Sequence, residues 1–219
     1  MIDPKVIALT STPVVRQIIE RIAIARKNNP PKRILDPSAG EGVFGMVCRE
    51  FWPEADITGI EPRDDLWPAP QYYDMWWRRT FEECGAGIGQ YDLICTNPPF
   101  PLCLAWVKRI FDEGMLTAGG ELLFLQLNEL GQRGQANNEL WLQYPPIFQS
   151  RISGAINFKG KGTGKKSTSD MRNYSWWLWR NAPRRSPGWA CIDLPRLPSS
   201  DRTWVVPPGT ETDAPDTDA

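Results

Sequence analysis

The sequence predicts an α/β fold with a doubly wound, mostly parallel β-sheet that ends in an antiparallel strand pair. Three observations support this fold class. Short apolar runs typical of buried strands alternate with amphipathic segments of helical periodicity. Turns rich in glycine or proline directly follow two of these runs. The last two strand-like segments, residues 152–158 and 174–180, have no long helix between them, which favours an antiparallel pair.

Hydrophobic periodicity and the residues that end each segment define the expected elements. An amphipathic helix is expected over residues 13–27, opened by Thr12 and Pro13 as cap and first-turn residue. The stretch 63–84 is rich in proline and aromatic residues and predicts a loop or short helix. In chain order, the other expected elements are strand 33–35, helix 42–52, strand 56–62, a weak strand or turn near 80–81, strand 91–95, helix 102–116, strand 121–127 and helix 136–144.

The length of 219 residues predicts one domain with a substantial core. We expect this single domain over residues 1–185, followed at 186–219 by a proline-rich, acidic and partly disordered tail. No apolar run approaches the roughly 20 residues that cross a membrane, and the first residues lack the features of a signal peptide. The sequence therefore predicts a protein without membrane association.

Cysteine and histidine usage limits the possible chemistry. The five cysteines are odd in number, scattered and without CxxC spacing, which indicates a cytoplasmic protein with buried thiols and neither disulfides nor a zinc site. The chain contains no histidine. A histidine base, a Ser-His-Asp triad and a histidine-bound metal are therefore excluded, and no metal cofactor is expected.

Charge is distributed unevenly along the chain. Residues 151–196 contain ten basic and two acidic side chains, whereas the rest of the chain contains 15 basic and 24 acidic ones. Such a basic block predicts a face that binds a polyanion, although solvated loop lysines would give the same pattern. Five of these basic residues lie between the last two expected strands: Lys159, Lys161, Lys165, Lys166 and Arg172.

The segment DPSAGEG, residues 36–42, lies between an expected strand and an expected helix. This is the context of a glycine-rich cofactor turn, in which glycines allow positive φ and close approach of a ligand to the backbone. The segment is neither GxGxxG nor a Walker A loop, so it is not typical of a pyrophosphate site. Glu61 ends the next strand about twenty residues later, where a carboxylate can accept hydrogen bonds from ribose hydroxyls.

The segment TNPPF, residues 96–100, follows another buried strand. Ligands of open α/β sheets bind at the carboxyl ends of strands. The Asn97 side-chain oxygen and the Pro98 carbonyl can accept hydrogen bonds from both hydrogens of an amine, and the prolines keep these acceptors rigid. Phe100 can stack on a planar substrate. This segment predicts chemistry on an amine, which requires no histidine.

Together the two segments resemble class I S-adenosylmethionine-dependent amino-methyltransferases, which modify exocyclic nitrogens of nucleic-acid bases. DPSAGEG resembles the cofactor loop of that family, and TNPPF resembles its (D/N/S)PP(Y/F/W) catalytic motif. The cofactor motif precedes the catalytic motif, as in members without circular permutation. The resemblance covers residues 10–180 and implies a Rossmann-like fold with S-adenosylmethionine as cofactor.

The resemblance also implies roles for individual residues. The implied catalytic residues are Asn97, Pro98, Pro99 and Phe100. The implied cofactor-binding residues are Thr12, Asp36, Pro37, Ser38, Gly40, Glu61 and Asn97. Members of this family often carry an acidic residue on the third strand near the cofactor's adenine. Here Thr80 or Glu82 would take that place. The segment from Ser169 to Trp179 resembles the part that closes the target-base pocket.

The activity that this resemblance implies is methylation of the adenine N6 amine in DNA. Little chain remains for a separate recognition domain, so sequence specificity should be weak or very short. Adenine N6 in RNA, cytosine N4 in DNA and glutamine side chains in proteins are alternative acceptors with the same amine chemistry. A nucleic-acid-binding protein with a vestigial cofactor fold is the non-enzymatic alternative. Methylation at cytosine C5 is rejected, because the chain has no Pro-Cys.

Overall fold

The computed structural model describes residues 10–66, 70–132, 134–152, 156–158, 168–170, 173–182 and 190–194. The strands are β1 (Arg33–Asp36), β2 (Asp56–Ile60), β3 (Met75–Trp77), β4 (Tyr91–Thr96), β5 (Leu116–Leu127), β6 (Phe148–Ile152), β7 (Ile156–Phe158), β8 (Thr168–Asp170), β9 (Tyr174–Arg180) and β10 (Ala190–Leu194). The helices are α1 (Thr12–Ala25), α2 (Val43–Phe51), α3 (Cys103–Asp112) and α4 (Gly134–Gln143). Short 3-10 helices are η1 (Asp64–Leu66), η2 (Ala86–Ile88), η3 (Phe100–Leu102) and η4 (Asn128–Gln132).

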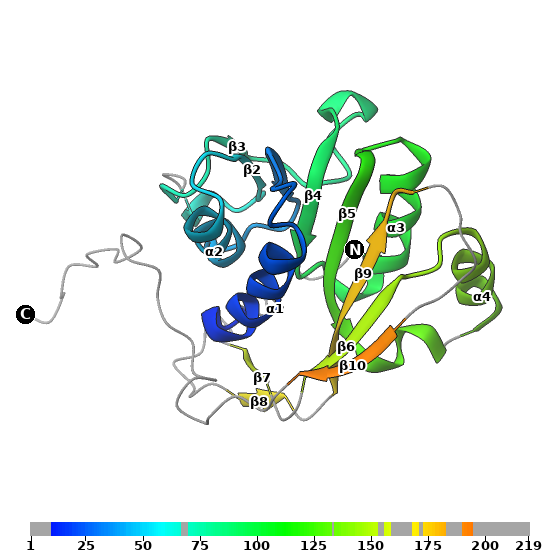
Figure 1. Ribbon diagram of the computed structural model, residues 1–219. Helices are drawn as coiled ribbons and strands as arrows, with labels where there is room; N and C mark the ends of the chain where they lie inside the picture. The colour runs from blue at the N-terminus through cyan, green and yellow to red at the C-terminus, as the bar shows by residue number, and fades with distance from the viewer. Residues whose placement is uncertain are drawn as a thin grey trace, which may run out of the picture.

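Eight strands form one sheet in the order β10-β6-β9-β5-β4-β1-β2-β3 (Figure 1). β9 runs antiparallel to both of its neighbours, β5 and β6. The other neighbouring strands pair in parallel. The predicted doubly wound, mostly parallel sheet with an antiparallel terminal pair is therefore confirmed. β7 and β8 pair with each other in a separate hairpin.

This topology brings several strand ends to one edge of the sheet. We call it the carboxyl edge, because β1, β2, β4, β5 and β6 all end there. β9 starts at the same edge, since Tyr174 pairs with Leu127 at the end of β5. The β7–β8 hairpin follows β6 and precedes β9 in the chain, so it is connected to this edge.

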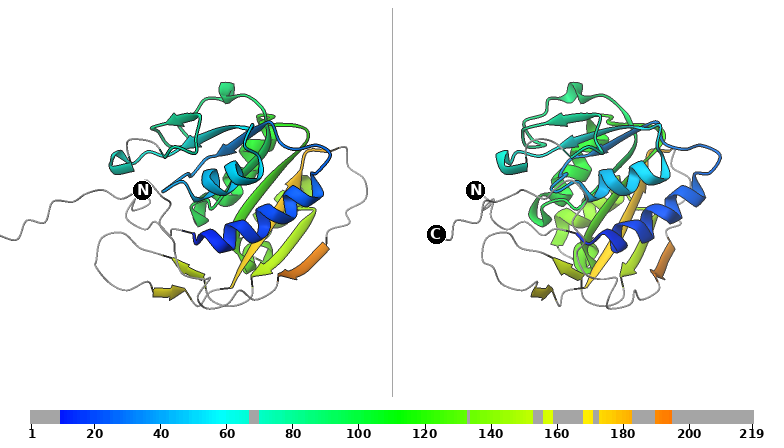
Figure 2. Two further views of the ribbon diagram at one scale, coloured as in Figure 1. Left: turned by 60° about the vertical axis from the view of Figure 1, so that its left-hand side comes forward. Right: turned by 90° about the vertical axis from the view of Figure 1, so that its left-hand side faces the viewer.

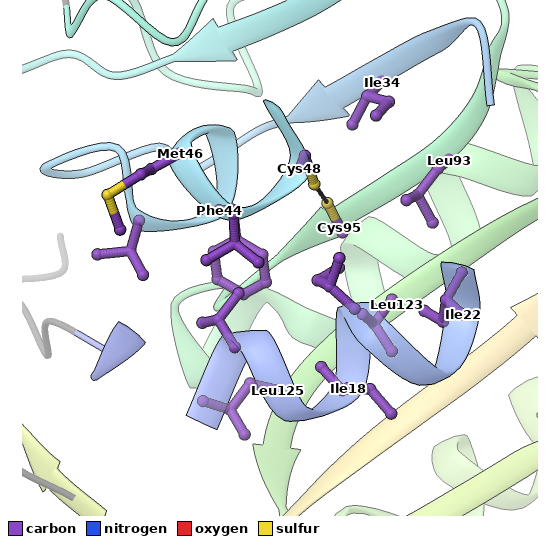
Figure 3. Close-up of a cluster of buried hydrophobic side chains, with 14 of the residues drawn as sticks. Ile18, Ile22, Ile34, Phe44, Met46, Cys48, Leu93, Cys95, Leu123 and Leu125 are labelled. Carbon is purple, nitrogen blue, oxygen red and sulfur yellow. Dashed lines mark hydrogen bonds between the residues drawn. The ribbon is translucent and has the colours of Figure 1, made fainter. Parts of the chain in front are cut away.

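Helices cover both faces of the sheet. α1 and α2 lie together over one face, and apolar side chains between them and the sheet form the first half of the core (Figures 2 and 3). α3 and α4 pack against the other half of the core. β5 supplies both halves alternately: Leu123 and Leu125 face α1 and α2, whereas Leu122 and Phe124 face α3. This alternation is the period of a strand that is buried on both faces.

The first helix forms as its pattern predicts. α1 begins with Pro13 in its first turn, and its apolar stripe is buried against the sheet. In the described part of the chain, no helix combines the length and apolarity that a membrane span requires. Four cysteines are buried, as expected: Cys48, Cys84, Cys95 and Cys103. Three tryptophans of β9 are buried as well: Trp176, Trp177 and Trp179. The structure does not describe the side chain of Cys191.

Two strands differ from the prediction. The third strand is Met75–Trp77, which pairs with β2 where Gly59 leaves room for the ring of Trp76, and the residues near 80–81 form a turn, the other expectation for that place. A Cβ at Gly59 would lie 2.8 Å from that ring. The expected strand 152–158 is split between β6 and β7. β6 already starts at Phe148 and ends at Ile152, and it pairs with both β9 and β10.

β10 lies inside the segment that the sequence assigns to the tail. It pairs in parallel with β6 over residues 190–194, so the sheet continues past the expected boundary at residue 185. Proline-rich composition on both sides of this short strand hides it in the sequence. Residues 195–219 of the expected tail lie outside the described part of the chain.

Candidate functional site

The two motifs meet at the carboxyl edge. β1 and β4 are adjacent and parallel, with Ile34 opposite Leu93 and Leu35 opposite Ile94. The glycine turn (residues 36–42) leaves β1, and the Asn-Pro-Pro-Phe turn leaves β4 at the same edge. This is the part of an open α/β sheet where ligands bind.

The glycine turn is compact and bonded to β2. Gly40 and Gly42 have positive φ values of 55° and 87°. The Ala39 N–H donates to the Ile60 carbonyl at 3.0 Å, and the Gly42 N–H donates to the Ala39 carbonyl at 2.9 Å. Since Gly42 is also the N-cap of α2, the chain turns from strand to helix within a few residues. A side chain at Gly42 would be strained by this conformation.

Asp36 ends β1 and is buried beneath this turn. Its Oδ2 accepts a hydrogen bond from the Tyr73 hydroxyl at 2.9 Å, and its Oδ1 accepts one from the Ser38 N–H at 3.3 Å. Burial raises the pKa of Asp36 from 3.8 to about 7, and the nearby charge of Glu61 adds to the rise, whereas the hydrogen bonds oppose it. Asp36 therefore holds the start of the glycine turn through its hydrogen bond from the Ser38 N–H. It also places a titratable charge under that turn.

Glu61 follows β2 and is also buried. Its Oε2 accepts the Gly40 N–H at 2.9 Å, which ties the glycine turn to the neighbouring strand. Its Oε1 accepts two hydrogen bonds from Arg63, one from the backbone N–H at 3.1 Å and one from the side-chain Nε at 2.7 Å. Nη1 and Nη2 of Arg63 are buried and have no hydrogen-bond partner among the described residues. Glu61 and Arg63 together present an acceptor and two donors beside the turn.

The start of α1 contributes hydroxyls to the same edge. The Asn97 Nδ2 donates to Thr10 Oγ1 at 3.0 Å, which brings the segment before α1 next to the end of β4. Ser11 Oγ and Thr12 Oγ1 are buried and have no hydrogen-bond partner among the described residues. Unpaired buried hydroxyls are costly, so a polar ligand at this place would stabilise them. The three successive hydroxyls fit the rim of a polar binding site.

Asn97 follows β4 directly and is partly buried. Because its Nδ2 donates to Thr10, the orientation of the amide is fixed. The carbonyl oxygen, Oδ1, therefore points to the other side of the side chain. A fixed amide oxygen at the end of a strand is suited to accept a hydrogen bond from a ligand.

The residues after Asn97 form a rigid turn with an aromatic side. Pro98 is buried, and Pro99 has a φ of −54° and leads into η3. The Phe100 ring lies 5.7 Å from the ring of Tyr174, centre to centre, at an angle of 46°. Tyr174 starts β9, so the strand after the basic segment touches the Asn-Pro-Pro-Phe turn. Two aromatic rings thus lie at the end of this turn.

The structure brings together all the predicted catalytic and cofactor-binding residues at one edge: Thr12, Asp36, Pro37, Ser38, Gly40, Glu61, Asn97, Pro98, Pro99 and Phe100. The Oε1 of Glu82 accepts a hydrogen bond from the indole N–H of Trp106 in the first turn of α3. The Thr80 hydroxyl accepts the N–H of Glu83 in a local turn. The predicted nucleic-acid-binding residues lie outside the described residues: Lys159, Lys161, Lys165, Lys166 and Arg172.

Sequence reasoning missed Thr10, Arg63 and Tyr73. Thr10 and Arg63 lie next to predicted residues, and no pattern distinguishes them. Tyr73 could not have been identified either, since Gly45 and Gly59 leave room for a large neighbour but only the structure shows which residue fills it. Within the described residues, no three cysteine, aspartate or glutamate side chains form a group that could hold a metal.

Comparison with solved structures shows the fold. A chain from a study of complex assembly and conformational transition of the type I R-M system is similar, with a TM-score of 0.58 and 16% sequence identity. The match covers 88% of this chain and 45% of that one. The plantazolicin methyltransferase BpumL in complex with a triazolic desmethylPZN analog and SAH is similar with a TM-score of 0.54 and 12% identity, covering 78% of this chain and 85% of that one.

BpumL in complex with SAH alone gives a TM-score of 0.51 at 14% identity, over 78% of this chain and 84% of that one. No protein-family model and no curated protein sequence matches the chain. These likenesses confirm the predicted Rossmann-like class I methyltransferase fold. The chain spans less than half of the type I R-M chain that it resembles.

Proposed function

We propose that this protein is an S-adenosylmethionine-dependent methyltransferase that modifies the N6 amine of adenine in DNA. The position of Asn97 carries the proposal: its oriented amide leaves β4 beside the glycine turn of β1, in front of two prolines and an aromatic ring. The likeness to a methyltransferase crystallised with SAH supports the cofactor. The likeness to a chain of a type I R-M system supports DNA as the acceptor.

The residues at the carboxyl edge fit this cofactor. The glycine turn lets a ligand approach the backbone, and the buried carboxylates of Asp36 and Glu61 favour a cationic ligand with hydroxyl groups. Ser11 and Thr12 supply the unpaired hydroxyls at the rim. When bound, S-adenosylmethionine supplies a methyl group on a positively charged sulfur. We assign its binding to Thr12, Asp36, Pro37, Ser38, Gly40, Glu61 and Asn97.

Asn97 and Pro98 act on the acceptor amine. The lone pair of an exocyclic amine is delocalised into the ring, so the nitrogen is a poor nucleophile. Asn97 Oδ1 and the Pro98 carbonyl accept hydrogen bonds from the two N–H groups of the amine and draw the nitrogen towards tetrahedral geometry. Pro98 and Pro99 keep both acceptors in place, so no reorganisation is needed during the reaction. After methyl transfer the nitrogen is an acidic ammonium and releases one proton to water, so a strong base is unnecessary.

Phe100 holds the base by stacking, and its contact with Tyr174 fixes the orientation of its ring. A base in a duplex must be flipped out to reach this place. We propose that the basic residues between β7 and β8, together with Arg172, bind the phosphates. The hairpin is connected to β6 and β9 at the carboxyl edge, which supports this role.

The test is incubation of the full chain with labelled S-adenosylmethionine and unmethylated DNA, RNA or protein, followed by mass spectrometry of nucleosides and peptides. We expect N6-methyladenine in DNA. Asn97→Ala should lower the rate by roughly 10²–10³, the usual cost of losing a preorganised hydrogen-bonding group. Asn28→Ala removes an exposed asparagine after α1 and should leave the rate unchanged.

Other products would correct the proposal in defined ways. N6-methyladenine in RNA or N4-methylcytosine in DNA would keep the chemistry and change the acceptor. Methylated glutamine would remove nucleic acid as the substrate. Cofactor binding without transfer to any of the three polymers would favour a binding protein with a vestigial cofactor fold.

A further inference from the structure

Tyr73 makes two hydrogen bonds that connect the ends of the cofactor turn. Its hydroxyl donates to Asp36 Oδ2 at 2.9 Å and accepts the Gly45 N–H at 3.2 Å. Asp36 is the last residue of β1, and Gly45 is the third residue of α2. One phenol oxygen therefore bridges the strand before the turn and the helix after it.

The second bond meets a need of α2. The first N–H groups of a helix lack partners within the helix, and the N-cap side chain usually satisfies one of them. The N-cap of α2 is Gly42, which has no side chain to do so. Tyr73 takes this role from the loop between β2 and β3, while Gly42 keeps the positive φ that the turn requires.

The ring of Tyr73 fits a space that two glycines leave open. A Cβ at Gly45 would lie 2.5 Å from Tyr73 Cζ, and a Cβ at Gly59 would lie 2.9 Å from Tyr73 Cδ1. Gly59 is the residue of β2 directly opposite Asp36. The Trp76 ring packs against the Tyr73 ring at 5.1 Å in an edge-to-face arrangement. Any larger residue at either glycine would push the hydroxyl away from Asp36.

We propose that Tyr73 is the positioning residue of the cofactor turn, and that its bond to Asp36 sets how tightly the turn binds the cofactor. This inference rests on the proposed function. Tyr73 holds the carboxylate under the turn and stabilises its ionised form, which attracts the ammonium group that S-adenosylmethionine and S-adenosylhomocysteine share. The same hydroxyl keeps the start of α2 in place, so the turn is formed before the ligand arrives.

The charge on Asp36 depends on its surroundings from several elements. Glu61 after β2 disfavours the ionised form, and the thiols facing it are Cys95 on β4 and, hydrogen-bonded to Cys95, Cys48 on α2. The hydrogen bond with Cys48, and then burial, keep the pKa of the Cys95 thiol well above its ordinary value. Burial does the same for the pKa of the Tyr73 phenol, so both groups stay neutral. Tyr73 is thus a neutral donor to Asp36.

The test measures binding of S-adenosylhomocysteine by calorimetric titration with the full chain. Tyr73→Phe keeps the ring and removes the hydroxyl, and should weaken binding about tenfold, as expected for a hydrogen bond to a charged group. In the Asp36→Asn background, the same change should have a clearly smaller effect, because the bond to the carboxylate is already absent and only the bond to the Gly45 N–H remains to be lost. Loss of the donor also raises the pKa of Asp36, so the pH below which affinity falls should move upward.

Tyr144→Phe is the matched control, since Tyr144 donates to the carboxylate of Asp112 far from the turn. It should leave affinity within about twofold. Gly45→Ala displaces the Tyr73 ring without changing the phenol, and should weaken binding as Tyr73→Phe does. Tyr73→Phe, Tyr144→Phe and Gly45→Ala must each show a wild-type circular dichroism spectrum before titration.

Two results would overturn the inference. The first is an unchanged affinity after Tyr73→Phe. The second is an equal loss in the presence and absence of Asp36, which would mean that the Tyr73 hydroxyl acts only through its bond to the Gly45 N–H and not through Asp36. Absence of binding by the wild-type protein overturns this inference and the proposed function together. Tight wild-type binding without methyl transfer to any polymer counts against the proposed acceptor alone.

Discussion

The described part of the chain contains two tyrosine–aspartate hydrogen bonds, one on each side of the sheet. Tyr73 donates to Asp36 under the glycine turn, and Tyr144 donates to Asp112 between α4 and α3. The chemistry of the bond is the same, but the surroundings differ. Asp36 is fully buried, whereas the side chain of Asp112 is 36% exposed and also bound to Lys108.

Burial decides what each pair does. It raises the pKa of Asp36 to about 7, despite the bond from Tyr73. The hydrogen bonds from Lys108 and then Tyr144 lower the pKa of Asp112, because its exposed position leaves little desolvation to oppose them. The first pair keeps a carboxylate near its protonation midpoint at neutral pH, next to a candidate site. The second pair keeps a surface carboxylate ionised. The same two residue types are therefore functional candidates only where solvent is excluded.

The largest expected effect separates the two aspartates by pH. Because the pKa of Asp36 is about 7 in the folded protein and 3.8 ordinarily, its contribution to stability is complete below about pH 4 and is lost as the pH rises to 7. At about 1.4 kcal/mol per pH unit, the loss is at most roughly 4 kcal/mol. Asp36→Asn should remove this dependence from denaturant unfolding curves measured between pH 4 and pH 7.5.

For Asp112, the dependence of stability on pH should have the opposite sign, and Asp112→Asn tests this. Its folded pKa is lowered, so its contribution is present above the ordinary value and disappears as the pH falls through the acidic range. The effect should be small, because the group is exposed and screened. If both variants changed the pH dependence alike, burial would not be the cause of the difference between the pairs.

The second prediction breaks the geometry of the buried pair. Gly45→Ala places a Cβ 2.5 Å from Tyr73 Cζ, and should lower the free energy of unfolding by about 1–3 kcal/mol, as overpacking does. Gly85→Ala is the control, since a Cβ there meets no atom within 4 Å. Unfolding in urea measures both. A stabilised Gly45→Ala protein would show that Tyr73 can move away at no cost.

The smallest effect compares the two hydroxyls. Tyr73→Phe leaves the Gly45 N–H without its acceptor and should cost about 1 kcal/mol of folding free energy, the usual cost of a lost helix cap. Tyr144→Phe keeps the stacking of this ring on Phe111 at 4.8 Å and should cost less than about 0.5 kcal/mol. Thermal unfolding at one pH ranks the two variants, and the reverse order would contradict the comparison.

Most of the fold could be predicted because local patterns and tertiary packing agree. α1, β1, β4 and β5 have strong periodicity and clear ends, and they lie close to where the sequence places them. β3 and β10 could not be predicted, since only their neighbours make them strands. β3 depends on the space at Gly59, and β10 depends on the free side of β6.

The same reason limits prediction of the site. Asp36, Glu61 and Asn97 end strands and belong to recognisable motifs, so the sequence identifies them. Tyr73 belongs to no motif, because its role follows from its contact with residues 28 and 37 positions away. The bond between Asn97 and Thr10 joins positions 87 residues apart and is equally invisible in the sequence.

The central claim is that an oriented oxygen at position 97 activates an amine. The most direct measurement is the single-turnover rate of DNA methylation by the wild-type protein, Asn97→Ala and Asn97→Asp at saturating cofactor. We predict the order wild type, Asp, Ala, with the alanine variant roughly 10²–10³ slower than wild type, because aspartate keeps an acceptor oxygen and alanine does not. The account would be contradicted if the alanine variant were as fast as the wild type, or if the aspartate variant were no faster than the alanine variant.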